Sequence, residues 1–129
     1  MDETSTFVMS LRSWTPEWVI AVRLGLACLL GGLIGLEREI GNHDAGLRTH
    51  ILVCLAAATF TLVSVELVYW AGQKGAPADP IRAIEAVTAG VAFLAAGTII
   101  QARGQVQGLT TGAGLWLAGA IGVAAQHGE

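Results

Sequence analysis

The sequence predicts an all-α fold, a polytopic helical membrane bundle of about four transmembrane helices. The chain has 129 residues, of which 53% are hydrophobic and only 13% are charged. A soluble domain usually carries about 25% charged residues. Four apolar runs approach the roughly 20 residues that cross about 30 Å of hydrocarbon. The expected helices cover about residues 17–37, 50–71, 80–101 and 109–126. We expect them to form a single domain over residues 1–129, with no soluble C-terminal domain.

Turn and cap residues separate these runs. Residues 15–17 (Thr-Pro-Glu) and 79–80 (Asp-Pro) each place a polar cap before a proline, which is typical of a helix start. Residues 101–108 contain two glycines and are expected to form a loop. Thr110 or Thr111 is expected to cap the last helix.

Small residues recur at every fourth position of the first and last runs, which lets another helix approach closely. We expect these stripes to pack within the bundle. Because four short helices offer few internal partners, a second copy that forms a homodimer is an alternative partner for one stripe. The stripes are Ala27, Gly31 and Gly35, and Gly114, Ala118 and Gly122.

Four crossings place both chain ends on one side of the membrane and residues 38–48 and 101–108 on the other. Basic residues are equally frequent on the two sides, so the positive-inside rule leaves the orientation open. An aromatic belt is expected at the side of the chain ends, formed by Trp14, Trp18, Tyr69 and Trp70.

Charged residues inside the runs form a predicted intramembrane cluster of Arg23, Glu66, Arg82 and Glu85. An isolated charge at the bilayer centre costs about 3 kcal/mol on insertion scales, so we expect these groups to pair inside the bundle. One interpretation is an ion or proton vestibule in which Glu85 titrates. The other is a set of structural ion pairs that fix helix registry, which the balance of charges favours.

A second group of charges lies between the first two runs, in the stretch Gly31–His50. Three carboxylates near one connection are weak candidate ligands for Mg²⁺, the one cofactor considered, because hydrated magnesium binds through one or two carboxylates. Interleaved arginines oppose this by neutralising the field. The carboxylates are Glu37, Glu39 and Asp44, and the arginines are Arg38 and Arg48 of the same stretch and Arg103 of the loop 101–108, which is expected on the same side of the membrane. His43 and His50 are weaker candidates still, as transition-metal ligands.

Several function classes find no support. The chain has no nucleophile elbow, no phosphate-binding glycine loop and no H-x-x-x-H or C-x-x-C spacing, so we expect no enzyme. A formal charge of −3 argues against nucleic acid as a partner. Cys28 and Cys54 lie in apolar runs and are expected to be packing residues.

Several ordered motifs resemble one known family. GLACLLGGLIGLEREI, AGLRTHILVCLAAATFTLVS, DPIRAIEAVTAGVAFLAAGTI and VQGLTTGAGLWLAGAIGV, which together span about residues 20–125, are similar to the membrane domain of the MgtC/SapB family. The resemblance implies a bacterial inner (plasma) membrane protein linked to magnesium homeostasis, growth in low magnesium and virulence. It also implies that residues 38–48 and 101–108 face the cytoplasm and that both termini lie outside, in the periplasm.

The chain departs from the family pattern in three places. It stops after the fourth helix, it reads AFLAAG at residues 92–97 where members commonly have GFLGAG, and it has Gln107 where a basic residue is frequent. The resemblance places candidate functional motif residues at Glu37, Arg38, Arg48, Thr49 and Thr111.

Two hypotheses of function follow. The first is a non-enzymatic regulator that acts in magnesium-stress physiology by helix–helix contact with a membrane protein complex. The second is a small oligomeric transporter or channel in which Glu85, opposed by Arg23, gates ion or proton movement.

Overall fold

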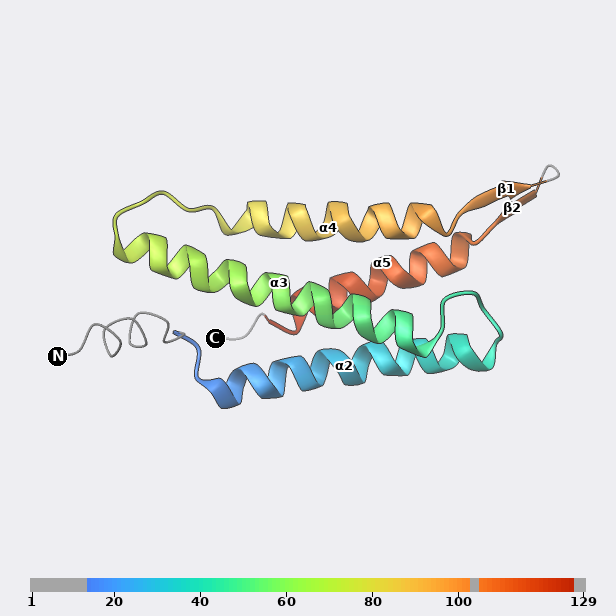
Figure 1. The fold of residues 1–129 in the computed structure, drawn as a ribbon, viewed down its shortest axis with the longest axis horizontal. Helices are drawn as coiled ribbons and strands as arrows, with labels where there is room; N and C mark the ends of the chain where they lie inside the picture. Colours follow the sequence, from blue (N-terminus) through green and yellow to red (C-terminus); the bar gives the residue numbers. More distant parts are fainter. Residues whose placement is uncertain (1–13, 103–104, 127–129) are drawn as a thin grey trace, which may run out of the picture.

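In the described residues, four helices run along the length of the molecule, each antiparallel to the next helix in the chain (Figure 1). The computed structural model describes residues 14–102 and 105–126. In this part of the chain the helices are α2 (Glu17–Ile40), α3 (Leu47–Gln73), α4 (Pro80–Gly97) and α5 (Leu109–Ala124). The start of α2 and the end of α5 lie at one end of the bundle, and the α2–α3 connection lies at the other. The predicted all-α bundle is confirmed.

The outside of the bundle is apolar. α2, α3 and α4 are long and apolar enough to cross a membrane, whereas α5 is apolar but has only 16 residues, a length of about 24 Å. Large side chains point outward, including Trp18, Ile40 and Phe93, which are 71%, 75% and 81% exposed. Such a surface suits acyl chains, because it has few polar groups that need water. The chain is a membrane protein.

The third predicted helix is too long. α4 ends at Gly97, and the strand β1 (Ile100–Ala102) pairs antiparallel with β2 (Gln105–Gln107) where helix and loop were expected. The carbonyl of Ala95 accepts two hydrogen bonds from Thr98, from its N–H at 3.1 Å and from its hydroxyl at 2.7 Å. The β-branched residues that follow Gly97 favour extended backbone, which explains the early end.

The proline-marked helix starts differ from one another. Asp79 caps α4 as predicted, because its Oδ1 accepts a hydrogen bond from the N–H of Ile81 at 2.9 Å. Thr15 does not cap α2: Pro16 is the N-cap residue, and no side chain caps it. The predicted cap at Thr110 or Thr111 is also wrong. Gly108 holds the N-cap position of α5 at φ +83°, and a Cβ there would overlap the carbonyl of Thr98.

Small side chains form the core. α3 lies at its centre and packs against α2, α4 and α5, and the buried apolar residues are mostly alanines. Both predicted stripes point inward. Gly31 of α2 packs on Cys54, where a Cβ would lie 2.7 Å from the Cys54 Cβ, and Gly122 of α5 packs on the backbone of Cys54 and Ala58. The helices are therefore held by close backbone approach rather than by large interdigitating side chains.

Candidate functional site

The α2–α3 connection begins with a rigid helix end. Asn42 adopts a left-handed conformation at φ +51°, and its N–H donates to the carbonyl of Glu39 at 3.1 Å. The N–H of His43 donates to the carbonyl of Arg38 at 3.1 Å. These two bonds form a Schellman motif, which satisfies the last carbonyls of α2 and turns the chain back towards α3.

A carboxylate from α2 caps the next helix. Glu39 Oε2 accepts a hydrogen bond from the N–H of Leu47 at 2.8 Å, at the first residue of α3. Its negative charge also lies at the positive end of the α3 dipole. Gly46 precedes this bond, and a Cβ at that position would overlap the Glu39 carboxylate. Glu39 therefore serves the fold of the connection.

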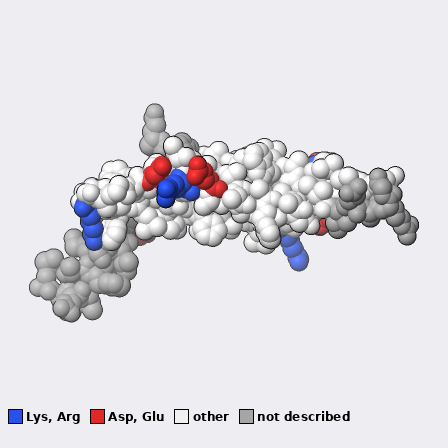
Figure 2. Space-filling view, turned by 90° about the horizontal axis from the view of Figure 1, so that it is seen from above, with Lys and Arg blue, Asp and Glu red and all other residues white. Residues whose placement is uncertain are grey.

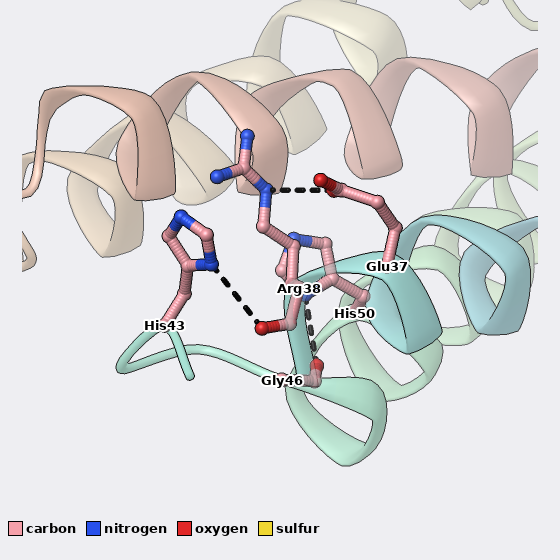
Figure 3. A network of polar contacts seen from close by, with 5 residues as sticks. All are labelled: Glu37, Arg38, His43, Gly46 and His50. Atoms are coloured by element: carbon pink, nitrogen blue, oxygen red, sulfur yellow. Dashed lines mark hydrogen bonds and ion pairs between the residues drawn. The ribbon is translucent and has the colours of Figure 1, made fainter. Parts of the chain in front are cut away.

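His50 is the most deeply buried polar side chain of this region (Figure 3). It has 0% exposure, and its Nδ1 lies 2.9 Å from the carbonyl oxygen of Gly46. Because a carbonyl only accepts, Nδ1 carries a hydrogen and donates it. His50 Nε2 and Arg38 Nε are buried, and neither hydrogen-bonds to a residue of the described ranges. Both nitrogens approach Gly114 of α5, where a Cβ would lie 3.2 Å from Nε2 and 3.6 Å from Nε.

The side chain of Arg38 is mostly buried but pairs with an exposed carboxylate. Its Nε lies 3.4 Å from Glu37 Oε2, the one ion pair found among the described residues. The Arg38 side chain is 14% exposed and that of Glu37 is 71% exposed. The guanidinium therefore lies beside Gly114, while its carboxylate partner Glu37 is exposed (Figure 3).

The five candidate motif residues separate into two groups. Arg38 and Thr111 lie inside, where Thr111 of α5 is 4% exposed. Glu37, Arg48 and Thr49 are exposed at the surface of the same end of the bundle. The motif thus combines a buried junction of α2, α3 and α5 with an exposed charged surface.

The candidate magnesium ligands are not gathered at one point. Glu39 is bonded to the backbone, Glu37 is paired with Arg38, and Asp44 is exposed. No group of three His, Cys, Asp or Glu side chains that could hold a metal occurs in the part of the chain that the structure describes. Arg103, predicted to lie near these residues, falls outside the described ranges.

We expect the melting temperature of the purified protein in detergent to stay unchanged when Mg²⁺ is added to millimolar concentration or removed with a chelator. The reason is that two of the three candidate carboxylates already have protein partners. Ca²⁺ and Na⁺ at matched ionic strength are the controls. A rise specific to Mg²⁺ that disappears in Glu37→Gln would contradict the expectation.

The structure does not gather the predicted intramembrane cluster into one network. Glu66 of α3 accepts backbone hydrogen bonds from Trp14 at 2.8 Å and from Thr15 at 2.9 Å. Arg23 of α2 donates from Nη1 to the carbonyl of Gln126 at 2.8 Å, just beyond the end of α5. A positive charge suits that negative helix end. These two charges bind the segments that enter α2 and leave α5.

Arg82 and Glu85 lie elsewhere. Both are exposed on α4, and neither makes an ion pair or a side-chain hydrogen bond with any described residue. α2 and α4 lie on opposite sides of α3 and α5 (Figure 1), so Arg23 and Glu85 do not oppose one another. The sequence could not show this, because it does not fix the rotation of each helix.

Replacing Glu66 with alanine is expected to lower the free energy of unfolding by about 1–3 kcal/mol, because two backbone N–H groups lose their acceptor. Glu66→Gln keeps one acceptor oxygen and should lose less. The stacked rings of Trp14 and Tyr69, whose centroids lie 4.4 Å apart, should also separate. Unfolding in detergent, followed by tryptophan fluorescence, measures both effects. Wild-type stability of Glu66→Ala, with exposed Glu17→Ala as the control, would refute the assignment.

Sequence reasoning missed the main structural roles at this end of the bundle. His50 was considered only as a metal ligand, and Gly46 and Asn42 were not singled out. One sequence signal could have indicated the turn. Residues 41–46 read GNHDAG, and Gly and Asn are typical of a left-handed turn after a helix end.

The fold and the connection define a polytopic helical membrane protein whose polar groups concentrate at the helix ends. The sequence model of the MgtC family matches residues 24–129. The chain belongs to the MgtC family, as the motif resemblance indicated.

Curated relatives agree with this assignment. Protein SapB of Bacillus subtilis (strain 168) is 37% identical over 120 residues, which cover 92% of this chain and 52% of SapB. Protein MgtC of Brucella abortus (strain 2308) is 41% identical over 110 residues, covering 85% of this chain and 43% of that protein. A protein of Escherichia coli (strain K12) named putative magnesium transporter YhiD is 38% identical over 110 residues, which cover 84% of this chain and 50% of that protein. The chain spans about half the length of these relatives. No solved structure matches it significantly.

Proposed function

We propose that this protein is a non-enzymatic component of the bacterial inner membrane that serves magnesium homeostasis and adaptation to low magnesium or related stress by contact with a membrane partner. Family membership supports the membrane setting. The printed name of the Escherichia coli relative supports the link to magnesium. The connection between α2 and α3 is assigned to the cytoplasmic side, and the start of α2 and the end of α5 to the outer side, on the family resemblance.

One observation carries the proposal of partner contact. The α2–α3 connection is held rigidly by the Schellman motif and by the Glu39–Leu47 bond, yet it exposes Asp44 and Arg48. A rigid loop with exposed charges of both signs is suited to recognition, because little side-chain and backbone freedom is lost on binding. We call the exposed residues Glu37, Asp44, Arg48 and Thr49 the connection surface.

Charge reversal on the connection surface tests the proposal. In a strain that lacks its own copy of the gene, Arg48→Glu and Asp44→Lys are expected to abolish growth complementation in low magnesium, with protein levels unchanged. A photo-crosslinking side chain at position 49 is expected to capture a membrane protein in wild type and to lose that product in Arg48→Glu. Lys74→Glu, at the opposite end of the bundle, is the control and should complement. Full complementation by both connection variants would overturn the proposal.

The alternative is an ion- or proton-coupled transporter that uses Glu85 and Arg23. Proteoliposomes separate the two functions. The proposed role predicts no flux of protons, sodium or magnesium above that of empty vesicles. Flux that Glu85→Gln and Arg23→Ala both abolish, in variants that still insert and remain monodisperse, would establish transport instead.

A further inference from the structure

One side of α4 is uncovered by the rest of the chain. Val87, Val91 and Ala95 form its inner stripe towards α3 and α5. The opposite side is exposed along its whole length, at alternating spacings of three and four residues that make a continuous seam along a helix. We call this side the outer face of α4; it consists of Arg82, Glu85, Ala89, Ala92, Phe93 and Ala96.

The two glycines of α4, Gly90 and Gly97, make no close contact within the described part of the chain. At Gly31, Gly35, Gly119 and Gly122 of the other helices, an added Cβ would meet a neighbour within 3 Å, so those glycines permit close packing. At Gly90 and Gly97 of α4 it would meet nothing within 4 Å. A groove of about 370 Å³ between α3 and α4 opens beside Gly90 and is bordered by Phe60 and Ala86. The flank of α4 beside its outer face is therefore open as well, and the outer face itself is exposed at each of its residues.

The outer face also carries two opposite charges at one end. Figure 2 looks onto the α4 side and shows one cluster in which basic atoms lie between two acidic groups, surrounded by uncharged surface, with the other charged side chains at a distance from it. Glu85 lies five residues after Pro80, a depth of about 7.5 Å along the helix. Arg82 and Glu85 are exposed without a partner among the described residues. Charges that face acyl chains are costly, and a partner of opposite charge removes much of that cost.

We infer that the outer face of α4 binds the same face of a second copy, about a two-fold axis along the membrane normal. The face is self-complementary in charge. Arg82 and Glu85 stand three residues apart, about 4.5 Å along the axis, so each Arg82 reaches the partner's Glu85 in a parallel helix pair. The alanines let the two α4 backbones approach closely. A two-fold arrangement makes both ion pairs at once and closes the assembly as a dimer. This dimer is independent of the proposed link to magnesium.

Charge exchange between two tagged copies tests the ion pairs. Wild-type copies with different tags are expected to co-purify from mild detergent. Arg82→Glu and Glu85→Arg should each lower self-association at least tenfold, because like charges then face one another. Mixing the two variants should restore co-purification to near the wild-type level, since one copy is then acidic and the other basic. Pairing within a single helix predicts no such rescue. Failure of the mixture to associate while wild type does, or a monomeric wild type, overturns the proposal.

Cross-linking locates the face without relying on charge. In a chain with Cys28→Ala and Cys54→Ala, Ala89→Cys is expected to form a disulfide-linked dimer in membranes, because facing Cα atoms in such a pair lie within disulfide reach. Leu33→Cys, exposed at 59% on α2, is the matched control and should remain monomeric. Equal cross-linking at both positions, or a cross-linked product whose mass is not twice that of the chain, refutes the α4 dimer and identifies another face or another protein.

Discussion

Among the glycines inside the four described helices, Gly122 is expected to be the one where an added methyl group (Gly122→Ala) is most damaging. A Cβ at Gly122 would overlap the carbonyl oxygen of Cys54, lie 2.8 Å from the Cβ of Ala57 and lie 3.1 Å from the N of Ala58. Two of these three atoms are backbone and cannot move away by a rotamer change. Overpacking typically costs about 1–3 kcal/mol, and backbone against backbone lies at or above the upper end. We expect a loss of at least 3 kcal/mol in the free energy of unfolding.

Gly25→Ala is the matched control. Gly25 lies on α2, is exposed, and would meet nothing within 4 Å of an added Cβ. Because alanine is a better helix former than glycine by about 1 kcal/mol, this variant should be as stable as wild type or slightly more stable. Thermal unfolding in detergent, followed by size-exclusion chromatography, measures both proteins. If Gly122→Ala has the same melting temperature as Gly25→Ala, the close contact of α3 and α5 is not a determinant of stability.

The architecture could be read from the sequence because it depends on features that a sequence displays. The length of each apolar run set the number of helices, and the Asp79-Pro80 pair located the start of α4. The stripes Ala27, Gly31 and Gly35, and Gly114, Ala118 and Gly122, pointed to close packing, and all six residues are buried in the structure. Periodicity and caps are local properties, so tertiary structure did not need to be known.

The partners of the charged residues could not be predicted in the same way. Glu66 binds backbone N–H groups about 50 positions earlier in the chain, and Arg23 binds a carbonyl about 100 positions later. The predicted pairing assumed that each charged side chain binds a side chain of opposite charge. Unpaired backbone N–H and C=O groups near helix ends are competing partners for these side chains. The rotation of α4 accounts for the other two charges, because Arg82 and Glu85 are exposed on the side of α4 that faces away from α3 and α5.

The hairpin β1–β2 shows how side chains override a helical pattern. The apolar run continued through Ile100, so length alone predicted a helix to residue 101. Thr98 instead bonds to the carbonyl of Ala95, and Gly108 then turns into α5 with its left-handed φ. This turn sets where Thr111 and Gly114 enter the junction with α2 and α3.

Substitution of His50 is expected to have the second largest effect. His50→Ala removes a fully buried ring and the hydrogen bond to the Gly46 carbonyl, which together should cost about 3–5 kcal/mol. His50→Leu fills most of the volume but loses the side-chain hydrogen bond, so the Gly46 carbonyl keeps only the backbone N–H of residue 50, at 3.2 Å, as its donor. His50→Asn retains an amide N–H near the position of Nδ1 and should therefore be the mildest of the three. Thr49→Ala, an exposed neighbour on the same turn, is the control and should stay within about 0.5 kcal/mol of wild type.

The contact of His50 with α5 gives this prediction a sharper form. Gly114→Ala would bring a methyl group to 3.2 Å from His50 Nε2, so the ring or α5 must shift. His50→Asn shortens the side chain and has no atom at the position of Nε2. Gly114→Ala should therefore cost less in His50→Asn than in wild type, by at least 0.5 kcal/mol in a double-mutant cycle. If the two changes in the free energy of unfolding are strictly additive, the His50 side chain does not support the position of α5. The junction of α2, α3 and α5 would then depend on Arg38 and Thr111 instead.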